Sequence, residues 1–320
     1  MNRYRLFAGF ILLVAAGLLL AACGAKPSAS PTATAVPPTA NPPTAVPPTA
    51  IPTPASPFNY DASVPFDIKI ISQTEQDGAT VTELSYAAHD PSFAPTMGGR
   101  TVATLVSPKG DGPFAGIMWI HGAGSDHHVT YLDEAVTLAS HGTVSLLPAG
   151  YFPWSAAPTG TQADQASITG QVIELRRAFD FLLAQPGVDP QRLGFVGQGW
   201  GSTYGGILAG VDQRAKTYVY IMGQPTIMNM MKGLGFPKDQ YGAIVKDLNP
   251  INFVPNAAPA SLFFQFWKND GEANISLDNQ YYAAASQPKQ IEWYENIDMK
   301  ADPVVKARQG WLIGQLNLAP

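Results

Sequence analysis

Residues that could do chemistry lie at the ends of strand-like runs in this sequence. One apolar run is followed by His121, Gly122 and Ala123, whose backbone N–H groups could face a developing negative charge. Two carboxylates, Asp270 and Asp298, follow later runs of the same kind. Ligand sites of open parallel sheets lie beyond the carboxyl ends of the strands, so these residues are candidates for one shared site.

A glycine-rich turn between a predicted strand and a predicted helix is the most informative segment. It reads Gly197-Gln198-Gly199-Trp200-Gly201. Gly197 and Gly201 let the strand and the helix nearly touch, because no Cβ stands between them. The position between them, Gly199, is where such a turn presents a nucleophile, and it has no side chain. The pattern therefore predicts a nucleophile-bearing turn that carries no nucleophile.

The predicted strands and helices indicate how these turns are positioned relative to one another. Runs rich in β-branched and aromatic residues predict strands at 66–72, 81–87, 101–106, 116–121, 143–148, 193–197, 217–222, 262–267 and 290–294. Apolar residues at three- and four-residue spacing, together with stop signals, predict helices at 131–140, 168–184, 201–209, 277–285 and 301–316. Strands come first and then alternate with helices. We expect an α/β domain with a mostly parallel, twisted sheet and helices on both faces.

The run 188–202 resembles the approach to the nucleophile elbow of the α/β-hydrolases, in the dienelactone-hydrolase-like and acetyl-esterase-like branch. The turn at His121 is similar to the oxyanion turn of the same family. The resemblance extends over residues 95–317. It implies the α/β-hydrolase fold and, in that family, hydrolysis of ester bonds.

The resemblance also assigns the catalytic positions, in the family order Ser, Asp, His. Gly199 takes the nucleophile position, Asp270 the acid position and Asp298 the base position. Realignment cannot restore the base, because no His follows His141. Two of three catalytic positions are therefore substituted, which favours a non-catalytic domain that binds an apolar or ester-like ligand, or a partner protein. The alternative is an ester hydrolase in which a carboxylate of the Asp270/Asp298 pair activates water.

The oxyanion and ligand-binding positions implied by the resemblance are His121, Gly122, Ala123 and Trp200. At the base position, a carboxyl with an ordinary pKa near 3.9 is a poor proton acceptor unless burial raises that pKa. The elbow residue of this family sits at positive φ, which costs a non-glycine residue ~1–3 kcal/mol. Gly199 removes that cost, so the substitution should stabilise the fold.

Neighbouring residues offer limited replacement for the lost groups. Ser202 lies one helical turn beyond the elbow and is predicted to be a first-turn helix residue. A loop with Ser125 and the Asp126-His127-His128 cluster follows the oxyanion turn, and adjacent His residues that point apart do not favour a metal site. The aromatic run 151–154, and the methionines 228, 230 and 231 of a cap-like insertion at 223–256, could line an apolar pocket or simply fill the core.

The first 57 residues do not read as a folded domain. Residues 1–22 combine early basic residues with a charge-free apolar run, which predicts a signal peptide. Leu20-Ala21-Ala22-Cys23 resembles the lipobox of bacterial lipoproteins, so Cys23 is expected to be the lipidated mature N-terminus. Residues 25–57 contain 11 Pro, which predicts a disordered tether over 23–57. The remaining residues, 58–320, form the predicted domain, exported and anchored to the outer face of the bacterial membrane.

Composition excludes several classes of function. A single Cys rules out a disulfide framework and a Cys-based zinc site. With 19 Lys and Arg against 24 Asp and Glu, the formal net charge is −5, so the chain lacks the basic footprint of a nucleic-acid binder. The sequence indicates neither a cofactor nor a metal. The expected partners are the membrane, through Cys23, and a small ligand.

Overall fold

The computed structural model describes residues 56–91, 98–122, 125–150, 158–231, 238–269, 272–296 and 298–319. The predicted signal peptide, Cys23, nearly all of the predicted tether, Ala123 and Asp270 lie outside these residues. Within the described ranges, no helix has the length and apolar character needed to span a membrane. Phe58, among the first described residues, has its ring buried in the core.

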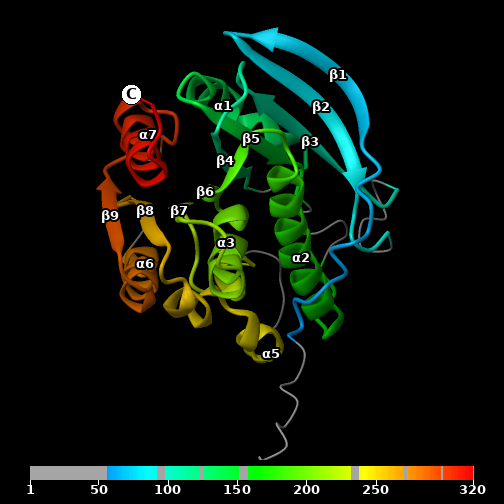
Figure 1. Ribbon diagram of the computed structural model, residues 1–320. Helices are drawn as coiled ribbons and strands as arrows, with labels where there is room; N and C mark the ends of the chain where they lie inside the picture. Colours follow the sequence, from blue (N-terminus) through cyan, green and yellow to red (C-terminus); the bar gives the residue numbers. More distant parts are fainter. Residues whose placement is uncertain are drawn as a thin grey trace, which may run out of the picture. The chain divides into compact units, whose positions relative to one another are not determined.

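A nine-stranded sheet organises the described residues, in the spatial order β1-β2-β3-β5-β4-β6-β7-β8-β9. From β5 to β9 in that order neighbouring strands are parallel, and β1, β2 and β3 join them antiparallel. The strands are β1 (Lys69–Gln76), β2 (Ala79–Ala87), β3 (Arg100–Ser107), β4 (Phe114–Ile120), β5 (Thr143–Pro148), β6 (Val188–Gln198), β7 (Thr217–Ile221), β8 (Ser261–Trp267) and β9 (Lys289–Tyr294). The predicted mostly parallel sheet is confirmed (Figure 1).

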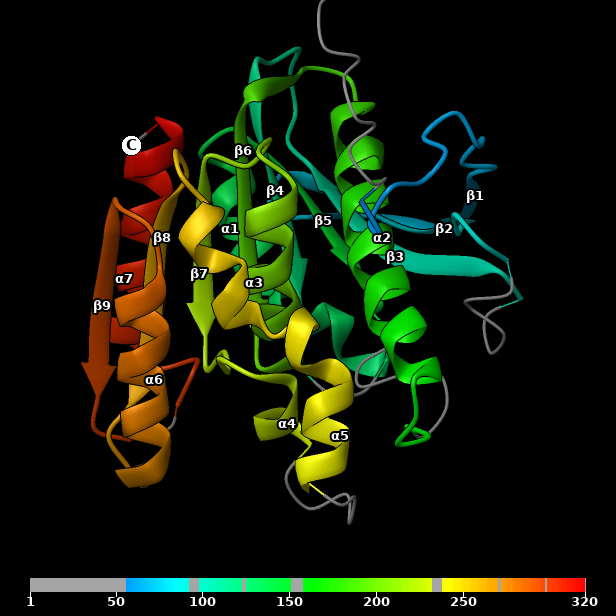
Figure 2. The same cartoon turned by 90° about the horizontal axis from the view of Figure 1, so that it is seen from below.

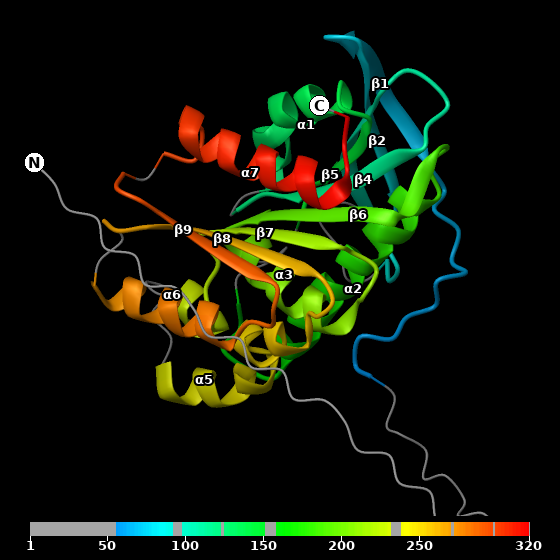
Figure 3. The ribbon, with the colours of Figure 1, turned by 60° about the vertical axis from the view of Figure 1, so that its left-hand side comes forward.

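Helices cover both faces of this sheet, as the continuous apolar strands require. The longer helices are α1 (Leu132–Ala139), α2 (Ala163–Leu183), α3 (Trp200–Val211), α6 (Glu272–Ala284) and α7 (Asp302–Leu316). Figure 3 shows α1 and α7 on one face, and α2, α3 and α6 on the other. Two separate clusters of buried apolar residues fill the two layers. The sheet is thereby fixed from both sides, and its strand ends become rigid positions for functional groups.

The first strand begins later than the sequence predicts. Phe66 was expected to start a strand, but its ring packs edge-on against Tyr86 and Phe181. Asp67 then has a φ of 43°, which interrupts extended backbone. The strand β1 extends to Gln76 through mostly polar residues and is exposed along most of its length. An exposed strand has no alternating apolar pattern, so its ends could not be located from sequence.

The predicted cap-like insertion, residues 223–256, is a set of short helices. It contains α4 (Ile227–Met230), α5 (Lys238–Val245) and three 3₁₀ turns at Lys246–Leu248, Pro250–Asn252 and Val254–Asn256. Figure 2 shows α4 and α5 side by side near α3. None of these helices was predicted from sequence, because each is too short for an amphipathic period to emerge. A further 3₁₀ helix, Ser125–Tyr131, leads into α1.

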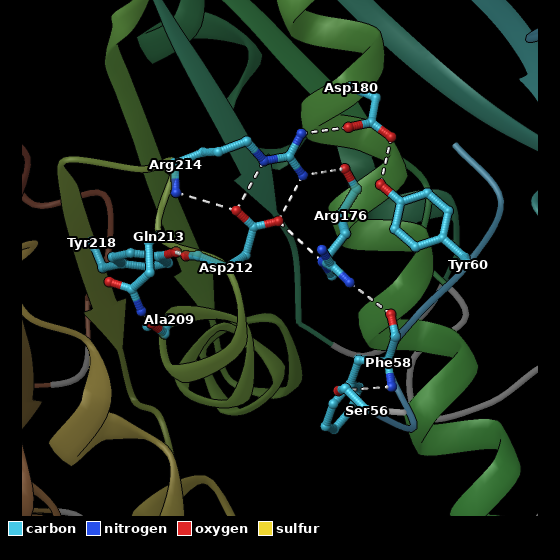
Figure 4. Close-up of polar contacts among 10 residues, drawn as sticks. All are labelled: Ser56, Phe58, Tyr60, Arg176, Asp180, Ala209, Asp212, Gln213, Arg214 and Tyr218. Atoms are coloured by element: carbon cyan, nitrogen blue, oxygen red, sulfur yellow. Dashed lines mark hydrogen bonds and ion pairs between the residues drawn. The ribbon is translucent and has the colours of Figure 1, made fainter. Parts of the chain in front are cut away.

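Asp212, just after α3, lies at the centre of a charged network (Figure 4). Its carboxylate accepts hydrogen bonds from Arg176 Nε at 3.1 Å and from Arg214 Nη2 at 2.6 Å. Arg214 also pairs with Asp180 of α2. Burial raises the pKa of Asp212, but the hydrogen bonds and charge of Arg214 and the hydrogen bond from Arg176 outweigh it and hold the pKa below its usual 3.8. The network joins α2 to α3.

The same side of α2 holds the first described residues of the chain. Arg176 Nη1 donates to the carbonyl oxygen of Phe58 at 2.7 Å, and the Tyr60 hydroxyl donates to Asp180 (Figure 4). Burial and the Asp180 hydrogen bond raise the pKa of Tyr60 to about 12, so the hydroxyl stays protonated and keeps donating. The fully buried guanidinium of Arg177 donates to three more carbonyls, those of Val64, Pro65 and Ala87.

Candidate functional site

The turn between β6 and α3 has the backbone of a nucleophile elbow. Gly199 has φ 52° and ψ −112°, a left-handed conformation that directly follows the strand and precedes the helix. Its N–H donates to the Ile221 carbonyl of β7 at 2.8 Å, and its carbonyl accepts from the Thr203 N–H and hydroxyl, both at 2.9 Å. Hydrogen bonds from two elements therefore fix this turn, although no side chain projects from its apex.

The flanking glycines, Gly197 and Gly201, allow the close approach of strand and helix that the sequence predicts. A Cβ on Gly197 would lie 2.7 Å from the carbonyl carbon of Gly201. A Cβ on Gly201 would lie 2.6 Å from the carbonyl oxygens of Ile120 and His121. These contacts are with backbone atoms, which cannot rotate away. Both glycines are therefore required by the close packing of β4, β6 and α3, whether or not the turn carries a nucleophile.

The end of β4 lies directly beside the elbow. Ile120 pairs with Gly197 in the parallel register, which brings Gly122 close to Gly199. The His121 ring is buried and does not line the pocket at the elbow: its Nε2 accepts a hydrogen bond from the Gly150 N–H at 2.9 Å. His121 therefore ties the ends of β4 and β5 together, and Gly122 is the member of this turn that faces the candidate site. The predicted third member, Ala123, lies outside the described residues.

A pocket of about 360 Å³ opens over the elbow. It lies at the ends of β4, β6 and β7, where open α/β sheets bind ligands. Its described lining residues contain amide, thioether and indole groups and no ionisable side chain. They are Gly122, Gln198, Gly199, Trp200, Met222, Gln224, Asn229, Met230 and Asn274. Of the positions assigned from sequence, the pocket thus brings together Gly122, Gly199 and Trp200.

Comparisons with solved structures agree with this arrangement. An acetyl xylan esterase from Paenibacillus sp. R4 superposes with a TM-score of 0.64 at 15% identity, over 79% of this chain and 90% of that one. An S-formylglutathione hydrolase from Agrobacterium tumefaciens gives 0.60 at 12% identity, over 78% and 99%. An α/β hydrolase from Penicillium sp. sh18 gives 0.51 at 13% identity, over 78% and 99%. The chain has the α/β-hydrolase fold. No protein-family model and no curated protein matches the sequence.

Asp298, which the sequence resemblance assigns to the base position, is exposed to solvent. Its carboxylate accepts a hydrogen bond from the Lys300 N–H at 3.0 Å, within its own loop. It is not among the residues that line the pocket. The acid position, Asp270, lies outside the described residues. The described part of the chain thus places the nucleophile position at the pocket and the substituted base position away from it.

Ser202 does not replace the missing nucleophile of the α/β-hydrolase elbow. Its side chain is fully buried on α3, and a Cβ on Gly223 would lie 2.3 Å from its hydroxyl oxygen. The hydroxyl is therefore packed against the chain that leaves β7, where a reagent cannot reach it. The prediction that Ser202 is a helix residue rather than a catalytic group agrees with this position. The predicted loop serine, Ser125, begins the 3₁₀ helix before α1.

Four carboxamides of the pocket were not identified from sequence. Gln198 is fixed by the Tyr131 hydroxyl, which donates to its Oε1 at 2.9 Å. Gln224 and Asn229 lie in one segment after β7 and Asn274 lies much later in the chain, and amides carry no characteristic spacing that would mark them beforehand. Met230, one of the methionines considered for a pocket, does line it, whereas its neighbour Met231 is buried in the core. The aromatic run 151–154 lies outside the described residues.

Two other features bear on the chemistry of this site. Met222 lines the pocket with φ 53°, an uncommon conformation for a residue with a side chain, costing ~1–3 kcal/mol. Among the residues whose placement is described, no group of three or more His, Cys, Asp or Glu side chains is arranged to hold a metal. The described lining residues of the pocket therefore offer hydrogen-bonding groups to a ligand.

Proposed function

We propose that this chain is a surface-anchored lipoprotein whose α/β-hydrolase domain binds a small ligand without hydrolysing it. The sequence resembles dienelactone-hydrolase-like and acetyl-esterase-like enzymes, so we infer that its pocket corresponds to their active-site pocket. Function depends on the site rather than the fold, so solved neighbours that are named as esterases and hydrolases do not by themselves make this domain an enzyme.

The observation that carries this proposal is the glycine at the apex of an otherwise intact elbow. Acyl transfer in this fold needs an oxygen nucleophile, an imidazole to accept its proton and a carboxylate to orient that imidazole. Gly199 provides no nucleophile, although its φ of 52° and the two flanking glycines keep the geometry that would present one. The nucleophile has been lost while the turn has been retained.

The pocket lining supports binding over an unusual hydrolytic mechanism. A carboxylate that activates water has to lie within hydrogen-bond reach of that water. The described lining residues include no carboxylate and no imidazole, and Asp298 is exposed elsewhere. A carboxylate-based ester hydrolase is the second candidate from sequence, and this observation disfavours Asp298 as its base. Hydrolysis of any member of a panel of simple esters above background, abolished by Asp298→Asn, would favour it instead.

The full chain should not react stoichiometrically with a serine-directed fluorophosphonate probe, because Gly199 offers no hydroxyl and Ser202 is packed in the interior. Gly199→Ser should add a hydroxyl without a clash, since a Cβ there has 3.8 Å to Gly122 and 3.9 Å to Met230. The variant should lose ~1–3 kcal/mol of stability to backbone strain. Its labelling should remain about a hundredfold or more slower than that of an active serine esterase, because no general base is present. Gel fluorescence and urea unfolding measure the two effects.

An active serine esterase treated in parallel serves as the positive control. The same esterase after heat denaturation serves as the negative control. Stoichiometric labelling of the unmodified chain, mapped to any serine by peptide mass, would contradict the non-catalytic proposal. Rapid labelling of Gly199→Ser alone would show that a proton acceptor does reach the elbow.

Anchoring through Cys23 forms the second half of the proposal. Expressed in a bacterium that processes lipoproteins, the full chain should partition into the detergent phase, because acylation of Cys23 adds buried CH₂ groups worth ~0.8 kcal/mol each. Cys23→Ala should remain in the aqueous phase or be retained as the unprocessed precursor. Detergent phase separation followed by intact mass measurement distinguishes these forms. Equal aqueous partitioning of both proteins, with no added lipid mass, would contradict lipidation.

A further inference from the structure

The pocket over the elbow is lined by carboxamides from four separate parts of the fold. Gln198 ends β6, Gln224 follows β7, Asn229 lies on α4 and Asn274 lies near the start of α6. Four amides converge here, where relatives of this fold place catalytic groups. A carboxamide has two N–H donors and a carbonyl acceptor and carries no charge. The pocket can therefore form many hydrogen bonds without an ionic partner.

Two of these amides carry a buried polar atom without a partner among the described residues. Gln224 is only 8% exposed, and its Oε1 has no hydrogen-bond partner among the described residues. The Nδ2 of Asn229 is likewise buried without a partner within the part of the chain that the structure describes. A buried polar group left without a partner costs about 1–3 kcal/mol, so a bound molecule that satisfies both groups is favoured. Both residues belong to the pocket lining, so a turn of either side chain would present its amide to a bound molecule.

The unused groups are of opposite kinds, which restricts the chemistry of the ligand. Gln224 offers an acceptor and Asn229 offers a donor. Gln198 adds a donor, because Tyr131 already occupies its Oε1 and leaves its Nε2 facing Gly122. A carboxylate can only accept hydrogen bonds and an ammonium can only donate them, whereas a hydroxyl does both. Adjacent hydroxyls therefore match this pattern better than either kind of ion.

Charge and size point to the same class of ligand. An ion entering the pocket would lose its hydration and find no opposite charge on the described lining residues. The start of α3 at Trp200 favours oxygen lone pairs, which a hydroxyl supplies as well as a carboxylate does. Trp200, Met222 and Met230 add apolar surface for C–H groups. The volume of about 360 Å³ is near the lower end of ligand pockets, ~300–1,000 Å³, which suits one small ring.

We propose that the carboxamide pocket over Gly199 binds an uncharged sugar ring through the paired donors and acceptors of Gln224, Asn229 and Gln198. This inference rests on the proposed non-catalytic function and specifies the ligand of that site. Loss of the nucleophile side chain leaves the pocket floor open for a ring to approach the backbone at Gly122 and Gly199.

The experiment compares four sugars that share one ring and differ in charge. Glucose and N-acetylglucosamine are neutral, glucosamine is a cation and glucuronate is an anion at about pH 6. Saturation-transfer NMR and titration with the full chain measure binding. We expect a neutral sugar to bind with a Kd of about 1 mM or tighter, and both ions to bind about tenfold or more weakly.

Gln224→Glu tests the site with almost no change in side-chain size. It keeps the acceptor and adds a negative charge, so selectivity should shift about tenfold from the neutral sugar towards the cation glucosamine. Asn229→Asp repeats the test at a second position, in case a buried carboxylate at 224 prevents folding. Gln280→Glu is the matched control, because Gln280 is exposed on α6 and outside the pocket, and its binding should equal that of the unmodified chain.

The inference would be overturned if neither neutral sugar binds at a concentration about ten times the expected Kd. Equal binding of glucuronate or glucosamine to the unmodified chain would overturn it too, as would unchanged selectivity in folded Gln224→Glu and Asn229→Asp. These results leave the non-catalytic proposal intact, because it depends on fluorophosphonate reactivity and ester hydrolysis. Fluorophosphonate labelling would overturn that proposal whichever sugar binds.

Discussion

The Gly201→Ala variant should lose about 3 kcal/mol or more of its free energy of unfolding. The added methyl group would lie 2.6 Å from the carbonyl oxygens of Ile120 and His121, where only a shift of β4 or α3 can relieve the overlap. Overpacking usually costs ~1–3 kcal/mol, and contact with rigid backbone places this site at or above that range. Chemical denaturation monitored by far-ultraviolet circular dichroism measures the change.

A glycine elsewhere in the same domain provides the matched control. Gly314 lies on the exposed side of α7, and a Cβ there would meet nothing within 4 Å. Gly314→Ala should therefore stabilise the protein, by up to about 1 kcal/mol, through the better helix propensity of alanine. A Gly201→Ala variant as stable as the unmodified chain would mean that β4 and α3 can separate without cost. In that case the glycines would not be required by packing.

Asp212→Ala should cost about 3 kcal/mol at neutral pH, because it leaves Arg176 and Arg214 without the buried carboxylate that both contact. Both guanidinium groups are partly exposed, with 22% and 31% of their side-chain surfaces accessible, so the expected loss lies at the lower end of the range for broken buried pairs. Urea unfolding gives the difference. Glu295→Ala, which breaks the exposed Lys268–Glu295 pair, is the control and should change stability by less than about 1 kcal/mol.

The pH dependence of this loss follows from the lowered pKa of Asp212. A carboxyl with a lower pKa in the folded than in the unfolded protein stabilises the fold fully above the unfolded pKa. That contribution declines as the pH falls towards and through the folded pKa. The difference between the unmodified chain and Asp212→Ala should therefore be constant near neutrality and shrink below about pH 4. A difference that grows on acidification would contradict this assignment.

Most of the fold could be predicted from sequence because most of its strands are buried. The strands β4, β5, β7 and β8 are buried along nearly their whole length and β6 is buried over 193–197, and the prediction located each of these buried segments. The exposed strand β1 and the short helices α4 and α5 have no such pattern, and there the prediction was displaced or missing. Apolar periodicity in a sequence arises from burial, so elements that bury few side chains are hard to predict from it.

The site was predictable only where backbone geometry dictates residue type. Gly197 and Gly201 could be read correctly because close packing excludes every other residue there. The amides of Gln198, Gln224 and Asn274 reach the pocket from segments that the fold alone brings together, and a glutamine or asparagine has no spacing that marks it as a site residue. The His121 ring was considered for the site, yet its hydrogen bond with the Gly150 N–H commits it to the junction of β4 and β5.

The hydrogen bonds between α2 and the start of the described chain determine where a mechanical load would enter the domain. Tension on the chain ahead of Ser56 first reaches Phe58 and Tyr60, which Arg176 and Asp180 hold to α2. The carbonyls of Val64 and Pro65, which Arg177 binds, come next, before the sheet begins at β1. Force would therefore be borne by side-chain hydrogen bonds from residues 176–180 of α2 instead of unzipping the edge hairpin. The elbow, at the other end of α3 from Asp212, would remain undisturbed under such a pull.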